Sequence, residues 1–157
     1  MDEKTNVMRF LDSRKISYNH YEYPHGESAV DGVTVASLIG KPVESVFKTL
    51  VTVGVDKRYF VFVVPVAKEL NLKKAAKAAG VKSIDMIKVS EIKNVTGYIR
   101  GGCSPIGMKK LYKTFIDKSA CELNSIIVSA GKIGAQVELP PDILAKLVNA
   151  AFTDITD

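Results

Sequence analysis

The segment from Thr96 to Gly107 reads TGYIRGGCSPIG and has the composition of a loop that could hold a ligand. Because glycine adopts backbone angles closed to other residues, the Gly101-Gly102 pair could present bare N–H and C=O groups to a bound molecule. Ser104-Pro105 then stiffens the end of the loop. The segment carries neither a phosphate-loop nor a dinucleotide pattern. An ordinary glycine-rich surface turn therefore remains an open alternative.

Lys48 is a cation inside a strongly apolar stretch that is typical of a β-strand. Strict alternation would place Lys48 on one face with Val46 and Leu50, on the inward side of the strand. An unpaired buried ammonium is costly, so such a lysine usually has a partner or borders a cavity. The alternative is a lysine that protects an edge strand against aggregation.

Cys103 lies within the glycine-rich segment and is a candidate nucleophile. A cysteine nucleophile needs a base and an orienting group, and the sequence shows no motif for either, so a small, partly buried thiol is the favoured interpretation. His20 and His25 do not have metal-ligand spacing with Cys103 or Cys121. We therefore expect no metal and no cofactor.

Two further patterns could contact a nucleic acid. Tyr18, Tyr21 and Tyr23 alternate in a predicted strand, where tyrosines either contact a ligand or pack in the core. The turn from Gly131 to Gly134 has the Gly-x-x-Gly pattern of clamps on nucleic-acid backbones, although four residues are a weak signal.

Hydrophobic periodicity and turn residues predict the elements that must position these groups. Strands are expected at 18–23, 46–53, 58–66, 83–87, 113–117, 125–129 and 135–138, with the second and third forming a hairpin. Helices are expected at 4–15, 33–39, 72–79 and 90–95, with a final helix from Pro140 to about Ala151. Hairpins with interspersed helices predict an α+β fold with a mixed, mainly antiparallel sheet.

Composition limits the class of protein. A chain of 157 residues with 46% hydrophobic and 25% charged residues is expected to form one globular domain, spanning residues 1–157. No apolar run approaches the roughly 20 residues of a membrane span, and the start lacks a signal-peptide pattern. We therefore expect a cytoplasmic protein without a membrane partner, consistent with only two cysteines. The net charge of +5 is compatible with RNA as a partner.

Several segments together resemble one family, the YbaK/EbsC group of free-standing aminoacyl-tRNA deacylases, which are relatives of the prolyl-tRNA synthetase editing domain. The most specific matches are the Lys48-Thr49 pair within VFKTL and the pattern Thr-Gly-Tyr-x-x-Gly-Gly-x-Ser-Pro that begins at Thr96. The segments VVPV at 63–66, LNLKKAAKAAG at 70–80 and VSAGKIG at 128–134 follow in the order of the family. The resemblance covers nearly the whole chain.

The resemblance implies a barrel-like mixed sheet with flanking helices, and hydrolysis of mischarged tRNA without a cofactor or metal. It implies that Lys48 is the essential residue, with Gly101 and Gly102 as catalytic loop residues. It also implies a set of substrate-binding positions: Tyr21, Val30, Asp31, Thr49, Tyr98, Ser104, Ser129, Gly131, Gly134 and Gln136. Where the family often has Asn-Phe-Gly this chain has Val30-Asp31-Gly32, and where a relative has Asp it has Gln136, which bears on the amino acid preferred.

The implied activity is removal of cysteine from tRNA(Pro), and also from tRNA(Cys). An aminoacyl ester is already activated, and the thiol of a cysteinyl ester can attack its own carbonyl. In this hypothesis Lys48 anchors the phosphate of the terminal adenosine or the carbonyl region, and the Gly101-Gly102 backbone stabilises the oxyanion.

Three alternatives remain open: an Ala- or Ser-specific deacylase that uses water, a non-catalytic module that binds tRNA or a synthetase, and a thiol enzyme acting through Cys103. The expected partners are the acceptor 3′ end of aminoacyl-tRNA and prolyl-tRNA synthetase.

Overall fold

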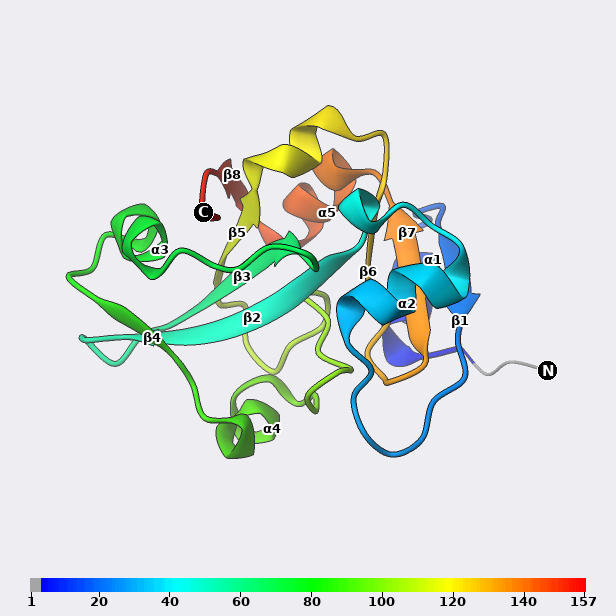
Figure 1. The fold of residues 1–157 in the computed structure, drawn as a ribbon, viewed down its shortest axis with the longest axis horizontal. Coiled ribbons are helices and arrows are strands. Elements are labelled where there is room, and N and C mark those ends of the chain that lie inside the picture. The colour runs from blue at the N-terminus through cyan, green and yellow to red at the C-terminus, as the bar shows by residue number, and fades with distance from the viewer. Residues whose placement is uncertain (1–3) are drawn as a thin grey trace.

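Two β-sheets form the frame of the computed structural model, which describes residues 4–157 (Figure 1). The larger sheet has the strand order β4-β2-β3-β5-β8, with bounds Ile84–Met86, Phe47–Gly54, Tyr59–Pro65, Lys113–Asp117 and Ala151–Thr153. The smaller sheet has the order β1-β7-β6, with bounds Asn19–Glu22, Ala135–Leu139 and Ile126–Ser129. An isolated parallel bridge between Val46 and Ile127 connects the two sheets.

Strand directions confirm the mixed, mainly antiparallel sheet. The pairs β1–β7, β6–β7, β2–β3 and β2–β4 are antiparallel, whereas β3–β5 and β5–β8 are parallel. The predicted hairpin of β2 and β3 is present, and its register places Lys48 opposite Val64. Every residue of β3 from Phe60 to Pro65 is buried, which makes this strand the centre of the larger sheet.

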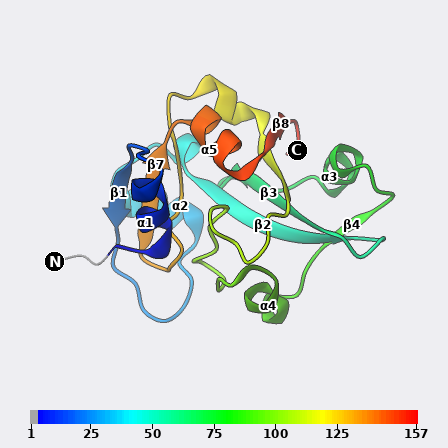
Figure 2. The same ribbon diagram turned by 180° about the vertical axis from the view of Figure 1, so that it is seen from behind.

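The helices flank the two sheets, as the front and rear views show (Figures 1 and 2). The α-helices are α1 (Asn6–Ser13), α2 (Gly32–Ile39), α3 (Leu72–Ala79), α4 (Ile92–Thr96) and α5 (Pro141–Val148). Short 3-10 turns cover Val43–Ser45, Val89–Glu91 and Lys118–Glu122. Side chains of Asp31 and Asn71 cap α2 and α3, as their position before an apolar periodic stretch predicts.

The end of the chain differs from the prediction, since the last helix stops at Val148 instead of continuing to about Ala151. Asn149 takes a left-handed conformation with φ 54°, and the N–H of Ala150 donates to the carbonyl of Ala145. Asparagine tolerates this conformation better than most residues and commonly ends helices. The residues after it form β8, a strand the sequence pattern did not indicate. A smaller difference is that the helix expected at 90–95 begins only at Ile92, because Ser90 lies inside the preceding 3-10 turn.

Two large apolar clusters stabilise the fold. One packs α1 and α5 against the smaller sheet and includes Leu11, Val137 and Leu144. The other packs α3 against the larger sheet and includes Phe62 and Ala75. Within residues 4–157, no helix combines the length and the apolar character that crossing a membrane would require.

Candidate functional site

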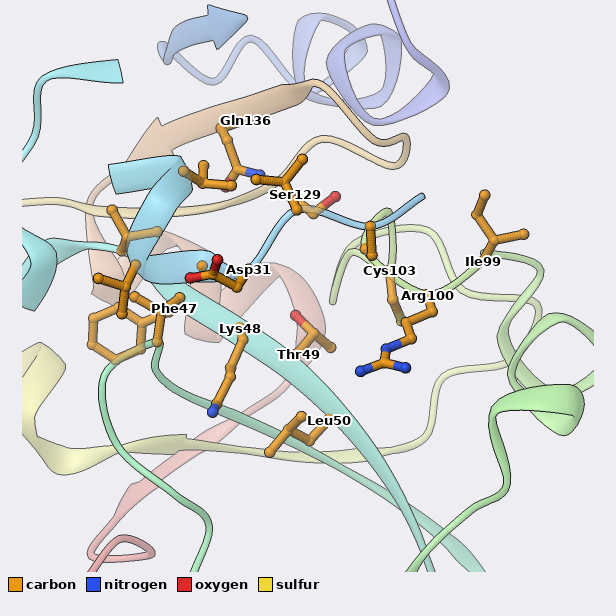
Figure 3. A pocket seen from close by; sticks show the side chains of 18 of the residues that line it. Asp31, Phe47, Lys48, Thr49, Leu50, Ile99, Arg100, Cys103, Ser129 and Gln136 are labelled. Carbon is orange, nitrogen blue, oxygen red and sulfur yellow. The ribbon is translucent and has the colours of Figure 1, made fainter. Parts of the chain in front are cut away.

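A cavity of about 980 Å³ lies between the open edge of β2, the segment 27–33 and the glycine-rich loop (Figure 3). This volume is at the upper end of the roughly 300–1,000 Å³ that small-molecule sites occupy. Its lining brings together residues that are distant in sequence, including Asp31, Lys48, Gly101, Ser129 and Gln136. The lining also mixes cations, carboxylates and apolar side chains, so the cavity suits a ligand with both polar and apolar parts.

The site lies beside β2 because one edge of that strand lacks a partner there. The pairing of β4 with β2 begins only at Thr52, the bridge to β6 lies at Val46, just before β2, and no strand pairing of this edge is found at Lys48, Thr49 or Leu50 among the described residues. As a result Lys48, Thr49 and Leu50 all line the cavity, although alternation places them on two faces. Lys48 borders a cavity, as one of the two expectations from the sequence had it. The cavity lies along the edge of β2, whereas alternation had predicted that Lys48 would point to one face of the sheet.

Lys48 extends into this cavity with 28% of its side chain exposed. Its Nζ lies 3.6 Å from Oε1 of Glu69, whose side chain is 81% exposed. A pair with one partner so exposed is weak. The ammonium can therefore exchange Glu69 for the negative charge of a ligand.

Thr49 places a buried hydroxyl at the same wall. Its Oγ1 is inaccessible to solvent and has no hydrogen-bond partner among the described residues. Buried polar atoms are nearly always paired, and an unpaired one destabilises the fold. Thr49 itself lines the cavity between Lys48 and Arg100 (Figure 3), but its hydroxyl lies beneath the cavity surface.

The glycine-rich loop contains a tight turn from Ile99 to Gly102. The N–H of Gly102 donates to the carbonyl of Ile99 at 3.0 Å, and Gly101 has φ +84°. This is the pattern of a type II turn, whose third position requires a positive φ. Since Gly102 uses its N–H within the turn, Gly101 is the member of the pair whose backbone faces the cavity.

Both glycines are also needed for close packing. A Cβ at Gly101 would lie 2.6 Å from Cβ of Ala29, and one at Gly102 would lie 2.9 Å from Cα of Lys132. Any side chain at either position would therefore push apart the segments that enclose the cavity. The two glycines fix the turn against both neighbouring loops.

Asp31 lines the cavity and also starts α2. Its Oδ1 accepts from the backbone N–H of Thr34 at 3.0 Å, and its Oδ2 accepts from the Thr34 hydroxyl at 2.6 Å. These hydrogen bonds lower the pKa of Asp31. Its neighbour Val30 lines the cavity as well, and Gly32 permits close contact with Val66.

Ser129 and Gln136 form a cross-strand pair of β6 and β7, so both side chains lie on the face that borders the cavity. Both are buried, and Figure 3 shows them together on one wall. The Oγ of Ser129 accepts from the N–H of Gly131 at 3.2 Å. The turn 131–134 therefore positions Ser129 without itself lining the cavity.

Six positions implied by the resemblance lie outside the lining residues: Tyr21, Tyr98, Gly102, Ser104, Gly131 and Gly134. Tyr21 donates its hydroxyl to Oε1 of Glu138 at 2.5 Å. Tyr98 donates to the carbonyl of Ile106 at 2.5 Å, and its pKa is raised to about 12 by burial. Ser104 is fully buried and accepts from the N–H of Ile106. The side chains of Tyr21, Tyr98 and Ser104 thus form hydrogen bonds within the protein and stabilise the segments around the cavity.

Cys103 lines the cavity, but its chemistry does not favour a nucleophile. Burial raises the pKa of its thiol to about 11, so the reactive thiolate is scarce at neutral pH. The thiol lies with Val51, Val95 and other apolar side chains. This environment agrees with a small, partly buried thiol.

Several lining residues were absent from the sequence-based candidates, among them Arg100, Glu69 and Ile99. Arg100 is the second residue of the turn Ile99–Gly102, so an arginine directly before two glycines was the available signal. Glu69 follows β3 and comes close to Lys48 only through the hairpin. No local pattern marks such a pair.

The sequence also matches a known protein family. Residues 27–147 match the model of the aminoacyl-tRNA editing domain. A protein of Enterococcus faecalis, provisionally named Cys-tRNA(Pro)/Cys-tRNA(Cys) deacylase EbsC, is 45% identical over 154 residues, covering 98% of this chain and 94% of the relative.

Solved structures share the fold. A hypothetical protein superposes with a TM-score of 0.86 at 19% identity, covering 98% of this chain and 100% of the other. A protein provisionally described as a trans-editing enzyme for prolyl-tRNA synthetase gives 0.84 at 22% identity, covering 99% of each chain. These two likenesses agree with the α+β architecture expected from the sequence.

Proposed function

This chain belongs to the aminoacyl-tRNA editing domain family, and we propose that it is a deacylase that hydrolyses the ester of mischarged cysteinyl-tRNA. Its proposed substrates are Cys-tRNA(Pro) and Cys-tRNA(Cys), the two that the name of the 45% identical relative gives. The observation that carries the proposal is that Lys48, Thr49 and Gly101 all line one cavity.

The proposed reaction divides the work between these groups. Lys48 lies where it can stabilise negative charge on the ester carbonyl oxygen, and the Gly101 backbone approaches the same region. Thr49 lies next to Lys48 in the same wall of the cavity. Ser129 and Gln136 form the opposite wall, where they can contact the amino acid. None of these groups needs to become a covalent nucleophile.

For a cysteinyl ester the nucleophile is the substrate's own thiol. After the thiol loses its proton, the sulfur bonds to the carbonyl carbon and the ester C–O bond breaks. The ribose oxygen then takes a proton, and the amino acid leaves as a cyclic thioester that water can open. Holding the thiol close to the carbonyl replaces an encounter between two molecules with an internal step.

A cavity whose amino acid wall carries Gln136 and Val30 could also accept alanyl or seryl esters, with water as the nucleophile. The test is the loss of label from Cys-tRNA(Pro), Cys-tRNA(Cys), Ala-tRNA(Pro) and Ser-tRNA(Pro), with the wild type and Lys48→Ala. We expect rapid loss from the cysteinyl substrates only, dependent on Lys48. Preferential loss of label from the alanyl or seryl substrates would instead identify the protein as a deacylase specific for alanine or serine.

A binding module without catalysis is the remaining alternative. It would bind tRNA but leave all four esters to decay at the spontaneous rate. That result would overturn the deacylase assignment.

We further propose that the protein acts together with prolyl-tRNA synthetase. The cavity is large enough for the acylated 3′ end but leaves the rest of the tRNA outside, so selection of tRNA(Pro) requires another contact. The test is whether prolyl-tRNA synthetase, added to the purified protein, increases deacylation of Cys-tRNA(Pro) more than that of Cys-tRNA(Cys). Equal rates with and without the synthetase would exclude this partnership.

A further inference from the structure

Arg100 occupies a position in the cavity that the proposed chemistry does not use. It is the second residue of the type II turn from Ile99 to Gly102, in which Arg100 has a negative φ and Gly101 a positive one. Its side chain therefore extends from the outer end of this turn. Figure 3 shows the guanidinium on the side of Thr49 opposite to Lys48. The turn is held on both sides by the close packing of Gly101 and Gly102, which fixes the backbone from which the exposed side chain of Arg100 extends.

Arg100 is also an arginine without a partner in the described part of the chain. The other three arginines each have one: Arg9 donates to Asn6, Arg14 lies over Phe10, and Arg58 pairs with Asp56. The carboxylates that line the cavity do not neutralise it, because Asp31 binds Thr34 and Glu69 pairs with Lys48. The third, Glu27, forms no ion pair within residues 4–157. Besides Lys48, the cavity is therefore lined by two cations that form no ion pair within residues 4–157, Arg100 and Lys93, and Arg100 is the one with a guanidinium.

We propose that Arg100 binds the phosphodiester that precedes the terminal adenosine of the bound tRNA. This inference rests on the proposed function, because it assumes that the ligand is an aminoacylated 3′ end. It assigns the phosphate to Arg100 and leaves Lys48 for the ester carbonyl. A guanidinium presents parallel N–H donors that match two phosphate oxygens, whereas a lysine acts as a point charge.

The surroundings of Arg100 fit a nucleotide. Ile99, which precedes it in the turn, is 49% exposed and lines the same cavity, so it offers an apolar surface to a sugar or base. The cavity volume of about 980 Å³ exceeds what a single amino acid needs. In the proposed binding mode, the nucleotide next to the ester has its phosphate at the end of the cavity that Arg100 borders.

The test uses the trinucleotide CCA in two forms, one with the natural phosphodiester before the terminal adenosine and one with a neutral methylphosphonate there. Binding to the wild type, Arg100→Gln, Arg100→Lys and the control Arg9→Gln is measured by calorimetry. We expect Arg100→Gln to weaken the natural trinucleotide about tenfold or more and to leave the methylphosphonate unchanged. Arg100→Lys should lie between, and Arg9→Gln should change neither.

Equal weakening of both trinucleotides by Arg100→Gln would overturn the assignment, as would a wild type that does not prefer the charged form. Deacylation of Cys-tRNA(Pro) is measured in parallel on the same variants. A wild type that prefers the phosphodiester but does not deacylate would refute only the proposed function. A wild type that deacylates without this preference would refute only the role of Arg100.

Discussion

The ammonium of Lys48 lies 3.6 Å from the carboxylate of Glu69, and this pair joins a shielded cation to an exposed anion. The side chain of Lys48 is 28% exposed and that of Glu69 is 81% exposed. Solvent screens such a pair, so its contribution to stability is small. In the absence of a ligand, Glu69 therefore acts as a weak counter-charge that a substrate can displace.

Replacing Glu69 by Gln should lower KM for deacylation about two- to fivefold, because the substrate no longer competes with a carboxylate for Lys48. We expect kcat to stay the same and the difference to vanish at high salt. Steady-state kinetics at two salt concentrations measure this, with Glu44→Gln, an exposed carboxylate outside the cavity, as the control. A lower kcat with unchanged KM would instead place Glu69 in the reaction.

Lys48→Ala should reduce deacylation about 100-fold or more, since it removes the positive charge proposed to stabilise the oxyanion. The fold should remain, because the side chain is partly exposed and its ion pair is weak. Single-turnover deacylation and thermal unfolding measure the two effects, and Lys68→Ala serves as an exposed control close by in sequence. Retained turnover in a folded Lys48→Ala variant would refute the proposed role.

Thr49→Val should stabilise the protein by about 1 kcal/mol and leave deacylation nearly unchanged, because it replaces a buried hydroxyl without a partner by a methyl group. The matched control is Thr52→Val in the same strand. The buried hydroxyl of Thr52 donates to the carbonyl of Phe60 at 3.0 Å, so its loss should destabilise the fold. Urea unfolding and deacylation are measured for both. Destabilisation by both substitutions would show that Thr49 has a partner in the free protein.

Gly101→Ala should cost more stability than Gly40→Ala. Both glycines have a positive φ, +84° and +69°, which costs an alanine about 1–2 kcal/mol. Only Gly101 adds a collision, with Cβ of Ala29 at 2.6 Å, and overpacking costs about 1–3 kcal/mol more. The measurement is the free energy of unfolding of both variants. If both lost the same amount relative to the wild type, the segment around Ala29 would have moved away from the turn at no cost.

Cys103→Ser should leave deacylation nearly unchanged, whereas a thiol enzyme would lose its activity. Alkylation gives an independent measurement, because it requires the thiolate. With a pKa raised to about 11 by burial, Cys103 should react slowly at pH 8 and faster up to about pH 11. Stability should fall over the alkaline range from about 9 to 11, because the unfolded chain loses this proton first. Full labelling of Cys103 at pH 8 would contradict this environment.

Much of the fold could be predicted from short-range patterns. Asp31 and Asn71 precede apolar periodic stretches and cap the expected helices. The hairpin of β2 and β3 follows from two apolar runs with a short link, and Gly80 ends α3 in a left-handed conformation. These features depend on interactions within a few residues, which are visible in the sequence itself.

Local patterns in the chain predicted the helices, most of the strands, the Lys48 candidate and the glycine turn. The packing of distant segments alone establishes where the edge of β2 is open, so that Lys48, Thr49 and Leu50 all line one cavity. The same packing places Glu69 and Arg100 in the cavity lining, leaves Tyr21 outside it and pairs β8 with β5. This division arises because local patterns specify single elements, whereas a site depends on which edges and loops pack together across the chain.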